Sequence, residues 1–401
     1  MTSYFQPDKG KSTYWQSTAP LRRRLYQTWP LLLVPAMVLL LPSAPKTKAG
    51  PPPVVNEWQS AVSSGEYPVL EREHVLSEFP LCGALRLDPA WKEKQQQKEP
   101  RLLPNDPCPN AANLQKLPKE EGKSSKKKLT LFMIYYENIP LLSEQIDSWL
   151  AWPDEIRRQM DFLIIDDGSQ VGARAMDLIW PHRDYLLSRL DLEVYEVEQD
   201  LSWNIGGARN LAAAVAKTEY LFLSDVDLLV DAPTATFLLT LLQEAETTTT
   251  TTSAMTVFNL FDRLRSDKVT HKPHPAVMLS SKKLYWAIGG CDEDFVGNYG
   301  HTDVHFFYRA GLTEGVRVVG VEKRMKQEGI PPIREIDEGT CPAWAKPTCD
   351  QLPRELTKRK RTRNTKANAV LFGDKKKKKK TWSNEYLRFG FHKAILQPPP
   401  R

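Results

Sequence analysis

The 401-residue sequence lacks several patterns that would place it in a common class of protein. None of its five cysteines forms a Cys-x-x-Cys pair, so a structural zinc site is not expected. Its lysine and arginine runs contain no interleaved aromatic residues, and nothing else in the chain indicates nucleic-acid binding. No Asn-x-Ser/Thr sequon occurs, so there is no glycosylation signal to support a luminal address. What is present is a globular composition, 41% hydrophobic and 26% charged, with enough length for one large core or two small ones.

An apolar segment near the N-terminus is the candidate membrane element. Trp29–Leu41 carries no charge, and the wider stretch 25–44 approaches the length of about 20 residues that spans a bilayer. Arginines 22–24 precede it, which predicts a cytosolic tail over residues 1–28 and a signal anchor over 29–44. The chain would then be a single-pass type II protein of the Golgi or endoplasmic reticulum membrane with a luminal catalytic domain. A cleaved signal peptide and a transit peptide or soluble leader are the alternatives.

Two further segments have the composition of spacers. Residues 45–128 are rich in proline, glutamine and charge without regular periodicity, and are predicted to form a stem or linker. Residues 331–401 contain basic runs and are predicted to be a partly disordered C-terminal extension, in which 354–380 is mobile.

The cysteines allow two short disulfide loops, if the compartment is oxidising. Cys341 could pair with Cys349, and Cys82 with Cys108. Cys291 is then left over and is expected to be packed in the core rather than reactive.

The segment 129–330 is predicted to form the catalytic domain. Apolar strands are predicted to start near residues 129, 161, 192 and 220, so that successive starts lie 32, 31 and 28 residues apart. This spacing matches βα units of about 30 residues and predicts a parallel sheet with helices on both faces. Asn138 is expected to cap the helix that follows the first strand.

Polar motifs follow three of these strands, where open α/β sheets bind their ligands. The strand in Glu219–Val230 is interrupted by Asp225-Val226-Asp227, two carboxylates that suit a divalent cation carrying a diphosphate. Asp166–Ser169 (DDGS) and Trp203–Asn210 (WNIGGARN) follow two other strands, and Arg209 at a helix start favours an anionic ligand. Taken singly, each motif is equally typical of a polar turn.

The order of these motifs resembles that of glycosyltransferases of the GT-A fold, especially the family-2-like group. A later stretch, Gly289–Phe306 (GGCDEDFVGNYGHTDVHF), is similar to their C-terminal galactosyltransferase motif, roughly GGxDEDFxGxGxEDxxF. The resemblance covers about Leu129 to Val321, nearly half the chain. It implies an α/β fold of the GT-A type, Rossmann-like and mainly parallel with helices on both faces, and a glycosyltransferase that moves a hexose such as galactose.

The resemblance also implies roles for individual residues. The resemblance assigns nucleotide-sugar binding, with a UDP-sugar expected, to Asp167, Arg209, Asp225, Gly289 and Gly290. The two glycines are expected to shape the acceptor side. Asp225 and Asp227 match the Asp-x-Asp motif that holds Mn²⁺ or Mg²⁺, and Asp303 matches the general base. Thr302 replaces the usual glutamate, and no histidine lies between His305 and His392, so the third metal ligand is unassigned.

The chemistry implied is transfer of a sugar to a glycan or glycoconjugate hydroxyl, with inversion expected if Asp303 takes the hydroxyl proton. The first alternative is a catalytically silent nucleotide-sugar or glycan-binding protein on the same fold. The second is a nucleotidyltransferase, which would carry a glycine-rich phosphate loop after its first strand. Tyr135–Pro140 (YYENIP) is not such a loop.

Overall fold

The computed structural model describes residues 69–71, 127–247, 256–274, 276–313, 315–351, 365–378 and 386–396, all within one compact unit, Pro53–Arg401. The predicted cytosolic tail and signal anchor lie outside the described residues, as do nearly all of the predicted stem and the pair Cys82 and Cys108. Within the described ranges no helix is both long enough and apolar enough to cross a membrane.

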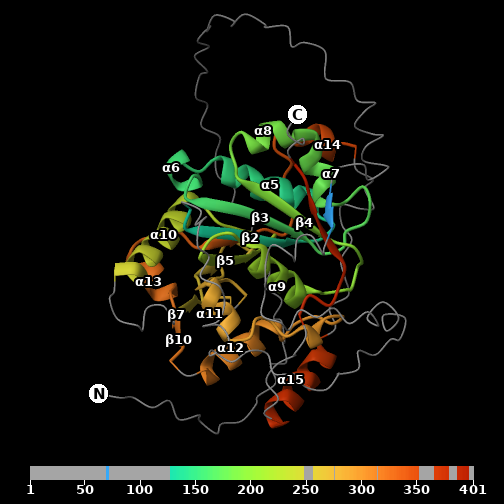
Figure 1. The fold of residues 1–401 in the computed structure, drawn as a ribbon. Helices are drawn as coiled ribbons and strands as arrows, with labels where there is room; N and C mark the ends of the chain where they lie inside the picture. The colour runs from blue at the N-terminus through green and yellow to red at the C-terminus, as the bar shows by residue number, and fades with distance from the viewer. Residues whose placement is uncertain are drawn as a thin grey trace, which may run out of the picture. The chain divides into compact units, whose positions relative to one another are not determined.

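A nine-stranded sheet forms the centre of this unit (Figure 1). Its four middle strands are parallel and lie in the order β4 (Leu192–Val197), β3 (Met160–Asp166), β2 (Leu129–Tyr135) and β5 (Tyr220–Asp225). Beyond β5 come β9 (Met278–Ser281), β7 (Thr256–Asn259) and β10 (Arg317–Gly320), and beyond β4 come β12 (Phe391–Ala394) and β1 (Val69–Glu71). The predicted parallel sheet is therefore confirmed at its centre, whereas β9 and β12 run antiparallel to the strands that they flank.

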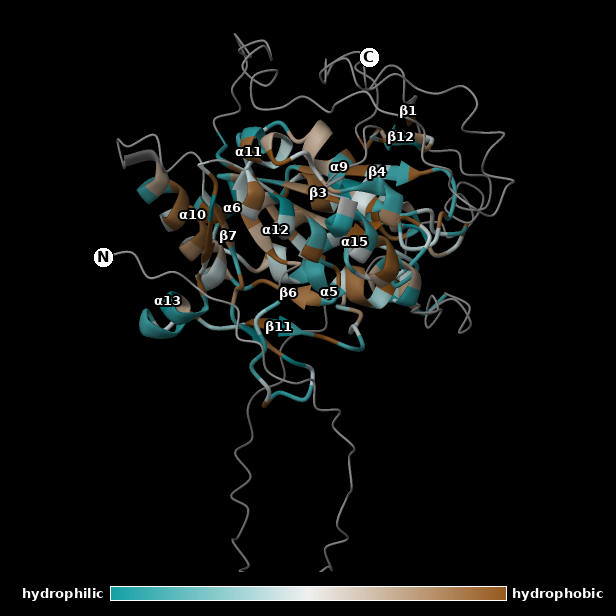
Figure 2. Cartoon of the chain, turned by 90° about the horizontal axis from the view of Figure 1, so that it is seen from below, coloured by the Kyte–Doolittle hydropathy of each residue, from teal (hydrophilic) through white to brown (hydrophobic). Residues whose placement is uncertain are grey.

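The middle strands are buried on both faces because their side chains alternate between two cores. On β2, Leu131, Met133 and Tyr135 enter one core, whereas Phe132 enters the other. The first core is covered by α5 (Ile139–Leu150), α7 (Ala175–Ile179), α8 (Arg183–Leu187) and α10 (Ala232–Thr247). The second is covered by α9 (Ile205–Val215), α11 (Lys282–Ala287) and α12 (Thr302–Leu312). Figure 1 shows the sheet between these two layers of helices, and Figure 2 shows that a covering helix such as α10 carries both hydrophobic and hydrophilic residues.

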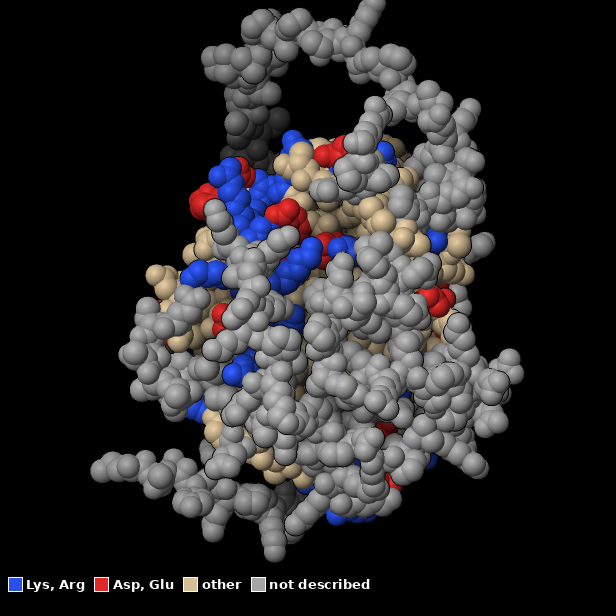
Figure 3. Space-filling model, viewed as in Figure 1, with Lys and Arg blue, Asp and Glu red and all other residues tan. Residues whose placement is uncertain are grey.

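Local signals define the ends of several helices. The Asn138 side chain accepts a hydrogen bond from the Leu141 amide, which confirms it as the cap of α5. Short helices complete the chain: α6 (Asp154–Arg157), α13 (Glu322–Gln327) and α14 (Lys346–Cys349). The surface where α6 lies in Figure 1 carries mixed charge in Figure 3, consistent with the ion pairs of Arg157 and Arg158 with Asp154.

The chain after residue 330 contributes to both sheets. β11 (Ile333–Glu335) forms a small sheet with β6 (Leu228–Leu229) and β8 (Arg263–Leu264), and β12 pairs with β4. Lys366–Lys378, expected to be mobile, forms the helix α15. The disulfide between Cys341 and Cys349 is confirmed, and Cys291 is a buried free cysteine as predicted.

Candidate active site

The strand order creates a topological switch point between β2 and β5. From β2 the chain proceeds to β3 and β4 on one side, and then crosses to β5 on the other side. The following segments diverge at such a point and leave a crevice beyond the carboxyl ends of the strands, which is the usual ligand site of open α/β sheets. Ile134 near the end of β2 pairs with Asp225 at the end of β5, so the Asp-Val-Asp motif lies at this crevice.

Arg209 connects this crevice to the galactosyltransferase-like motif. The side chain is 2% exposed and forms ion pairs with Asp225 (3.6 Å) and with Asp303 in the first turn of α12. Asp225 and Asp303 keep 31% and 22% of their side-chain surface in contact with solvent. Three residues assigned from separate motifs, up to 94 positions apart in the sequence, therefore meet at one partly open site.

The second aspartate of the motif lies among other acidic groups. Burial, then Asp225 and then Glu335 raise the pKa of Asp227 to about 7. Glu335 reaches this place because β11 pairs with β6, and the Ile336 amide donates to the Asp227 carbonyl (2.9 Å). Such a concentration of carboxylates is unfavourable without positive charge nearby, which Arg263 (3.8 Å from Glu335) supplies in part.

A histidine also lies near Asp225. Isolated bridges join Phe261 to His274 and Leu264 to His271, and His274 lies close enough to Asp225 for the two charges to interact. Burial lowers the pKa of His274 to about 4, while the Asp225 carboxylate acts in the opposite direction. The Nδ1 atom of His274 accepts from the Ala276 amide (3.1 Å), so the neutral ring carries its proton on Nε2, which can donate to a neighbouring acceptor.

The two aspartates that follow β3 behave differently from each other. Asp166 accepts from the amides of Ser169 (3.0 Å) and Ala175 (2.7 Å) and therefore holds its own turn together. Asp167, expected to bind the nucleotide, lies beyond the end of β3, two strands and about 10 Å from β5. A nucleoside diphosphate is long enough to span that separation. However, Asp167 is only 1% exposed in this structure.

The two glycines assigned to the acceptor side lie in a buried turn with positive φ angles of 95° and 58°. The carbonyl of Gly289 accepts from Arg309 (3.1 Å) and from the Tyr386 hydroxyl (2.6 Å), and that of Gly290 also accepts from Arg309. These contacts fix the turn that precedes the acidic run Asp292–Asp294 and direct both carbonyls into the protein.

The acidic run fastens the C-terminal segments to this turn. Glu293 is 3% exposed and accepts from Asn210 (2.8 Å) and from the amides of Leu387 (2.7 Å) and Arg388 (3.1 Å). Asp292 and Asp294 pair with Lys375 of α15 at 2.8 and 2.6 Å. The run therefore has a structural role.

α15 also holds the loop that leads into Asp303. The Asn368 side-chain amide, 1% exposed, donates to the carbonyls of Phe295 (3.0 Å), Asn298 (2.8 Å) and Gly300 (2.9 Å). His305, on the buried side of α12, has its pKa lowered to about 2 by burial and then by Arg309 and Lys375, so it remains neutral there.

The donor set at the crevice is chemically suited to a hard divalent cation, because it is made of carboxylate oxygens. The proximity of Asp225, Asp227 and Glu335 is the kind of charge concentration that a cation relieves. Within the described residues, however, no three histidine, cysteine or acidic side chains converge in a geometry that would hold a metal ion.

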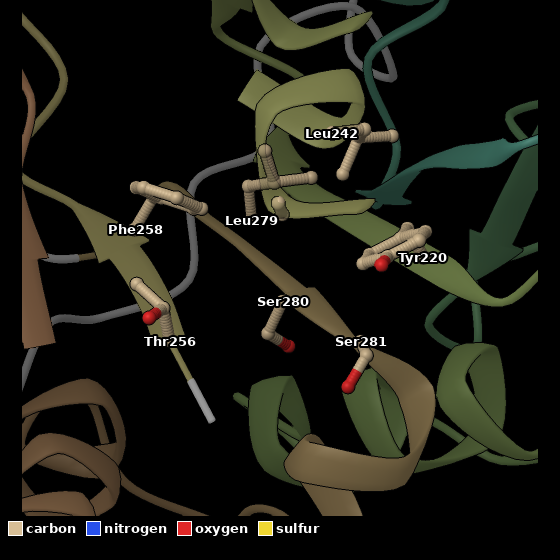
Figure 4. Close-up of a pocket in the computed structure, with 8 residues that line it drawn as sticks. Tyr220, Leu242, Thr256, Phe258, Leu279, Ser280 and Ser281 are labelled. Carbon is tan, nitrogen blue, oxygen red and sulfur yellow. The ribbon is translucent and has the colours of Figure 1, made fainter. Parts of the chain in front are cut away.

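A small cavity lies elsewhere, between α10 and the strands β5, β7 and β9 (Figure 4). Its volume of about 10 Å³ leaves room for no more than about one water molecule. It is lined by Tyr220, Leu242, Ala245, Thr256, Phe258, Leu279, Ser280 and Ser281. It cannot hold a nucleotide-sugar and is not part of the candidate site.

Comparison with known proteins gives limited information. No protein-family profile matches the sequence, and no curated protein sequence matches it. Among solved structures, S. aureus TarS aligns over 52% of this chain and 36% of its own, with 14% identity and a TM-score of 0.40. TarS 1–349 in complex with UDP-GlcNAc aligns over 53% and 60%, with 14% identity and a TM-score of 0.40.

A third solved structure is the mannosyltransferase PcManGT from Pyrobaculum calidifontis in complex with GDP-Man and Mn²⁺. It aligns over 56% of this chain and 62% of its own, with 17% identity and a TM-score of 0.35. The chain thus spans less than two thirds of the length of each of these proteins. Likeness of this degree carries no argument about function, which has to come from the residues of the chain itself.

The structure thus brings together Arg209, Asp225 and Asp303, and sets Asp227 among neighbouring acidic groups. The sequence motifs did not identify Glu335 and gave no role to His274. The unassigned third metal ligand was a weak signal for a histidine near the site. No local signal marked Glu335, because its place depends on the pairing of β11 with β6, more than 100 residues earlier in the chain.

Proposed function

We propose that this chain is a metal-dependent glycosyltransferase of the GT-A type that transfers a sugar from a nucleotide-sugar, with a UDP-sugar expected, to a glycan or glycoconjugate hydroxyl. The observation that carries the proposal is the buried Arg209, which pairs with Asp225 on the donor side and with Asp303 on the acceptor side. A site for transfer between two substrates needs both functions within reach of one reacting carbon.

In the proposed reaction Asp303 accepts the proton of the acceptor hydroxyl as that oxygen attacks the anomeric carbon. The bond from the anomeric carbon to the diphosphate oxygen breaks, and the nucleoside diphosphate leaves with the electron pair. Attack from the side opposite the leaving group inverts the configuration of the sugar. Arg209, the neighbour of both carboxylates, orients Asp303 and places positive charge near the departing diphosphate.

Asp225 and Asp227 would hold Mn²⁺ or Mg²⁺ together with the diphosphate, and Glu335 is the neighbouring carboxylate able to complete the ligand set. The cation supplies Lewis-acid stabilisation of the leaving group. The fit is one of donor chemistry rather than of a preassembled geometry.

The test is a UDP-sugar hydrolysis and transfer screen with Mn²⁺ and Mg²⁺. Asp303→Asn should keep UDP binding and lose transfer by roughly 10²- to 10⁴-fold, because only the general base is removed. Asp227→Asn should lose both metal-dependent UDP binding and turnover. Turnover unchanged in Asp227→Asn would reject this site.

The second candidate is a silent binding protein, which the Arg209–Asp303 ion pair favours because it engages the proposed base. Binding of UDP with Mn²⁺ by calorimetry, combined with no transfer to any acceptor tested, would establish this alternative.

We also propose a luminal location in the Golgi or endoplasmic reticulum, anchored by residues 29–44. The Cys341–Cys349 disulfide supports this, because disulfides persist in oxidising compartments. Protease protection of the C-terminal domain in intact microsomes, lost on detergent treatment, is the expected result. Digestion without detergent would place the domain in the cytosol.

A further inference from the structure

Two helix N-termini lie side by side at the candidate active site. A Cβ atom added at Gly206, near the start of α9, would lie 3.2 Å from Cγ2 of Thr302, the first residue of α12. Farther into the two helices, Arg209 meets Asp303. The segments that enter the two helices must therefore also run close together.

An aromatic pair is formed where these two segments meet. Trp203, two residues before α9, and Tyr299, three residues before α12, have ring centroids 4.6 Å apart and ring planes inclined at 62°. Both residues are half-buried, so part of each residue is exposed to solvent. The two rings meet at an angle and form an apolar corner in the segments that lead into α9 and α12.

The backbone that presents this corner is strained. Ser202 and Trp203 both have φ angles of +54°, a left-handed conformation that residues other than glycine seldom adopt. Two such residues in succession persist only where the surrounding structure over-determines them, and they are concentrated at functional sites. Here the Gly297 amide donates to the Ser202 carbonyl (2.8 Å), which ties the strained turn to the loop before α12.

We propose that Trp203 and Tyr299 bind one pyranose ring of the acceptor glycan. The C–H bonds on the face of a pyranose carry partial positive charge, and aromatic ring faces are negative, so the two stack favourably. The tyrosine hydroxyl adds a hydrogen-bonding group for the sugar's own hydroxyls. This assignment rests on the proposed function, because it names the acceptor side of that site.

The position of the pair favours the acceptor over the nucleobase. Tyr299 is four residues from Asp303, so their Cα atoms are at most about 14 Å apart, and the loop between them leads directly into the proposed base. The residues proposed for the nucleotide lie instead at the carboxyl ends of β3 and β5. Stacking on a nucleobase is therefore the competing result that the experiment must separate.

The experiment compares aromatic-to-leucine variants by steady-state kinetics, with p-nitrophenyl hexosides as acceptors and saturating UDP-sugar. Trp203→Leu and Tyr299→Leu should each raise the acceptor KM by roughly tenfold, while the KM for donor hydrolysis stays within twofold. Trp203→Phe should recover most of the acceptor affinity, since a ring face is restored. The matched control is Tyr185→Leu, an exposed aromatic residue of α8 on the opposite face of the sheet, which should change neither KM.

Saturation-transfer NMR with the same hexosides supplies a readout that does not need turnover. Saturation of pyranose C–H protons that is lost in Trp203→Leu supports the subsite even if no donor is hydrolysed, in which case the proposed enzyme activity fails alone. The subsite is overturned if a folded Trp203→Leu variant still hydrolyses donor and has an unchanged acceptor KM. It is also overturned if the donor KM rises instead of the acceptor KM. Absence of saturation transfer to every hexoside in the wild-type protein, where donor is hydrolysed, also overturns it.

Discussion

The half of the molecule proposed to bind the donor (β2 to β5, the donor half) and the half proposed to bind the acceptor (β7 to β12, the acceptor half) are held together in different ways. In the donor half the acidic motif begins at the end of a strand that pairs with another strand of the same segment, because Asp225 ends β5 beside β2. In the acceptor half the loop before Asp303 is held by Asn368, and the turn before it by Tyr386. The donor half is built from successive βα units, whereas the acceptor half is held in place by C-terminal residues such as Asn368 and Tyr386.

This difference has an energetic consequence. The donor half is stabilised mainly by apolar burial on two faces of the sheet, which is spread over many residues. The acceptor half depends in addition on a few buried polar contacts, in which loss of one partner leaves the other unsatisfied. Single polar substitutions should therefore affect the two halves unequally.

The largest expected effect is at Glu293. Replacement by alanine removes the acceptor of the buried Leu387 amide and one partner of the half-buried Arg388, and it deletes a carboxylate that is itself buried. Loss of one member of a buried ion pair costs about 3–5 kcal/mol. Chemical denaturation should show a drop of that order, and hydrogen exchange should accelerate in peptides covering 289–306 and 386–396.

Peptides covering β2 and β3 should exchange in Glu293→Ala as they do in the wild-type protein. The control is Glu155→Ala, an exposed glutamate of the donor half, which should change stability by no more than about 0.5 kcal/mol. If exchange rises equally in all peptides of Glu293→Ala, the two halves are one cooperative unit and the comparison fails.

A smaller effect is expected at the disulfide, which acts on the donor half. The segment around Cys341–Cys349 contacts α5, where the Trp344 indole donates to Asp147 (3.0 Å) and the Thr340 amide to Glu144 (2.8 Å). A loop closed over a sequence separation of 8 contributes about 2.5 kcal/mol by restricting the unfolded chain. The double variant Cys341→Ser/Cys349→Ser should lose that amount in denaturant titrations.

Exchange in the double-serine variant should rise in α5 and leave the loop before Asp303 unchanged. A reductant should destabilise the wild-type protein by a similar amount and have no further effect on the variant. If exchange instead rises in the loop before Asp303, the disulfide stabilises the acceptor half and the comparison fails.

Much of the donor half could be predicted from the sequence, because its signals are local. β2 (Leu129–Tyr135) starts at the predicted residue 129, since a short apolar run between polar residues fits a strand buried on both faces. Asn138 caps α5 through its own side chain. The spacing of successive strands, which indicates βα units, correctly placed Asp225 at the crevice.

The rest depends on pairings between distant segments, which local patterns do not encode. β12 joins the sheet beside β4, almost 200 residues earlier, although the segment 331–401 was expected to be a partly disordered extension. The sequence of α15 predicts a basic, mobile run, yet Lys375 in this helix forms ion pairs with Asp292 and Asp294. The near-complete burial of Asp167 likewise follows from packing around β3 and not from the DDGS motif.

The smallest expected effect, for each unit of pH, is a difference in pH dependence between the halves. Burial and then Glu196 raise the pKa of Asp166 in the donor half to about 8, whereas burial lowers that of His305 in the acceptor half to about 2. The native state binds a proton at Asp166 more tightly than the unfolded chain does, so this contribution is complete below about pH 4 and is lost as pH rises through 8. For His305 the unfolded chain binds the proton more tightly, so its contribution is complete above about pH 6.5 and is lost as pH falls.

Each of these two groups can change the free energy of unfolding by at most about 1.4 kcal/mol per pH unit. Hydrogen exchange, corrected for intrinsic rates, should therefore show the donor half loosening as pH rises from about 4 to 8, and the acceptor half loosening as pH falls below about 6.5. Asp166→Asn should flatten the alkaline response alone, because asparagine is neutral at every pH, and His305→Gln should flatten the acid response alone. If either variant alters the response of the other half, the polar contacts that close the acceptor half also govern the stability of the donor sheet.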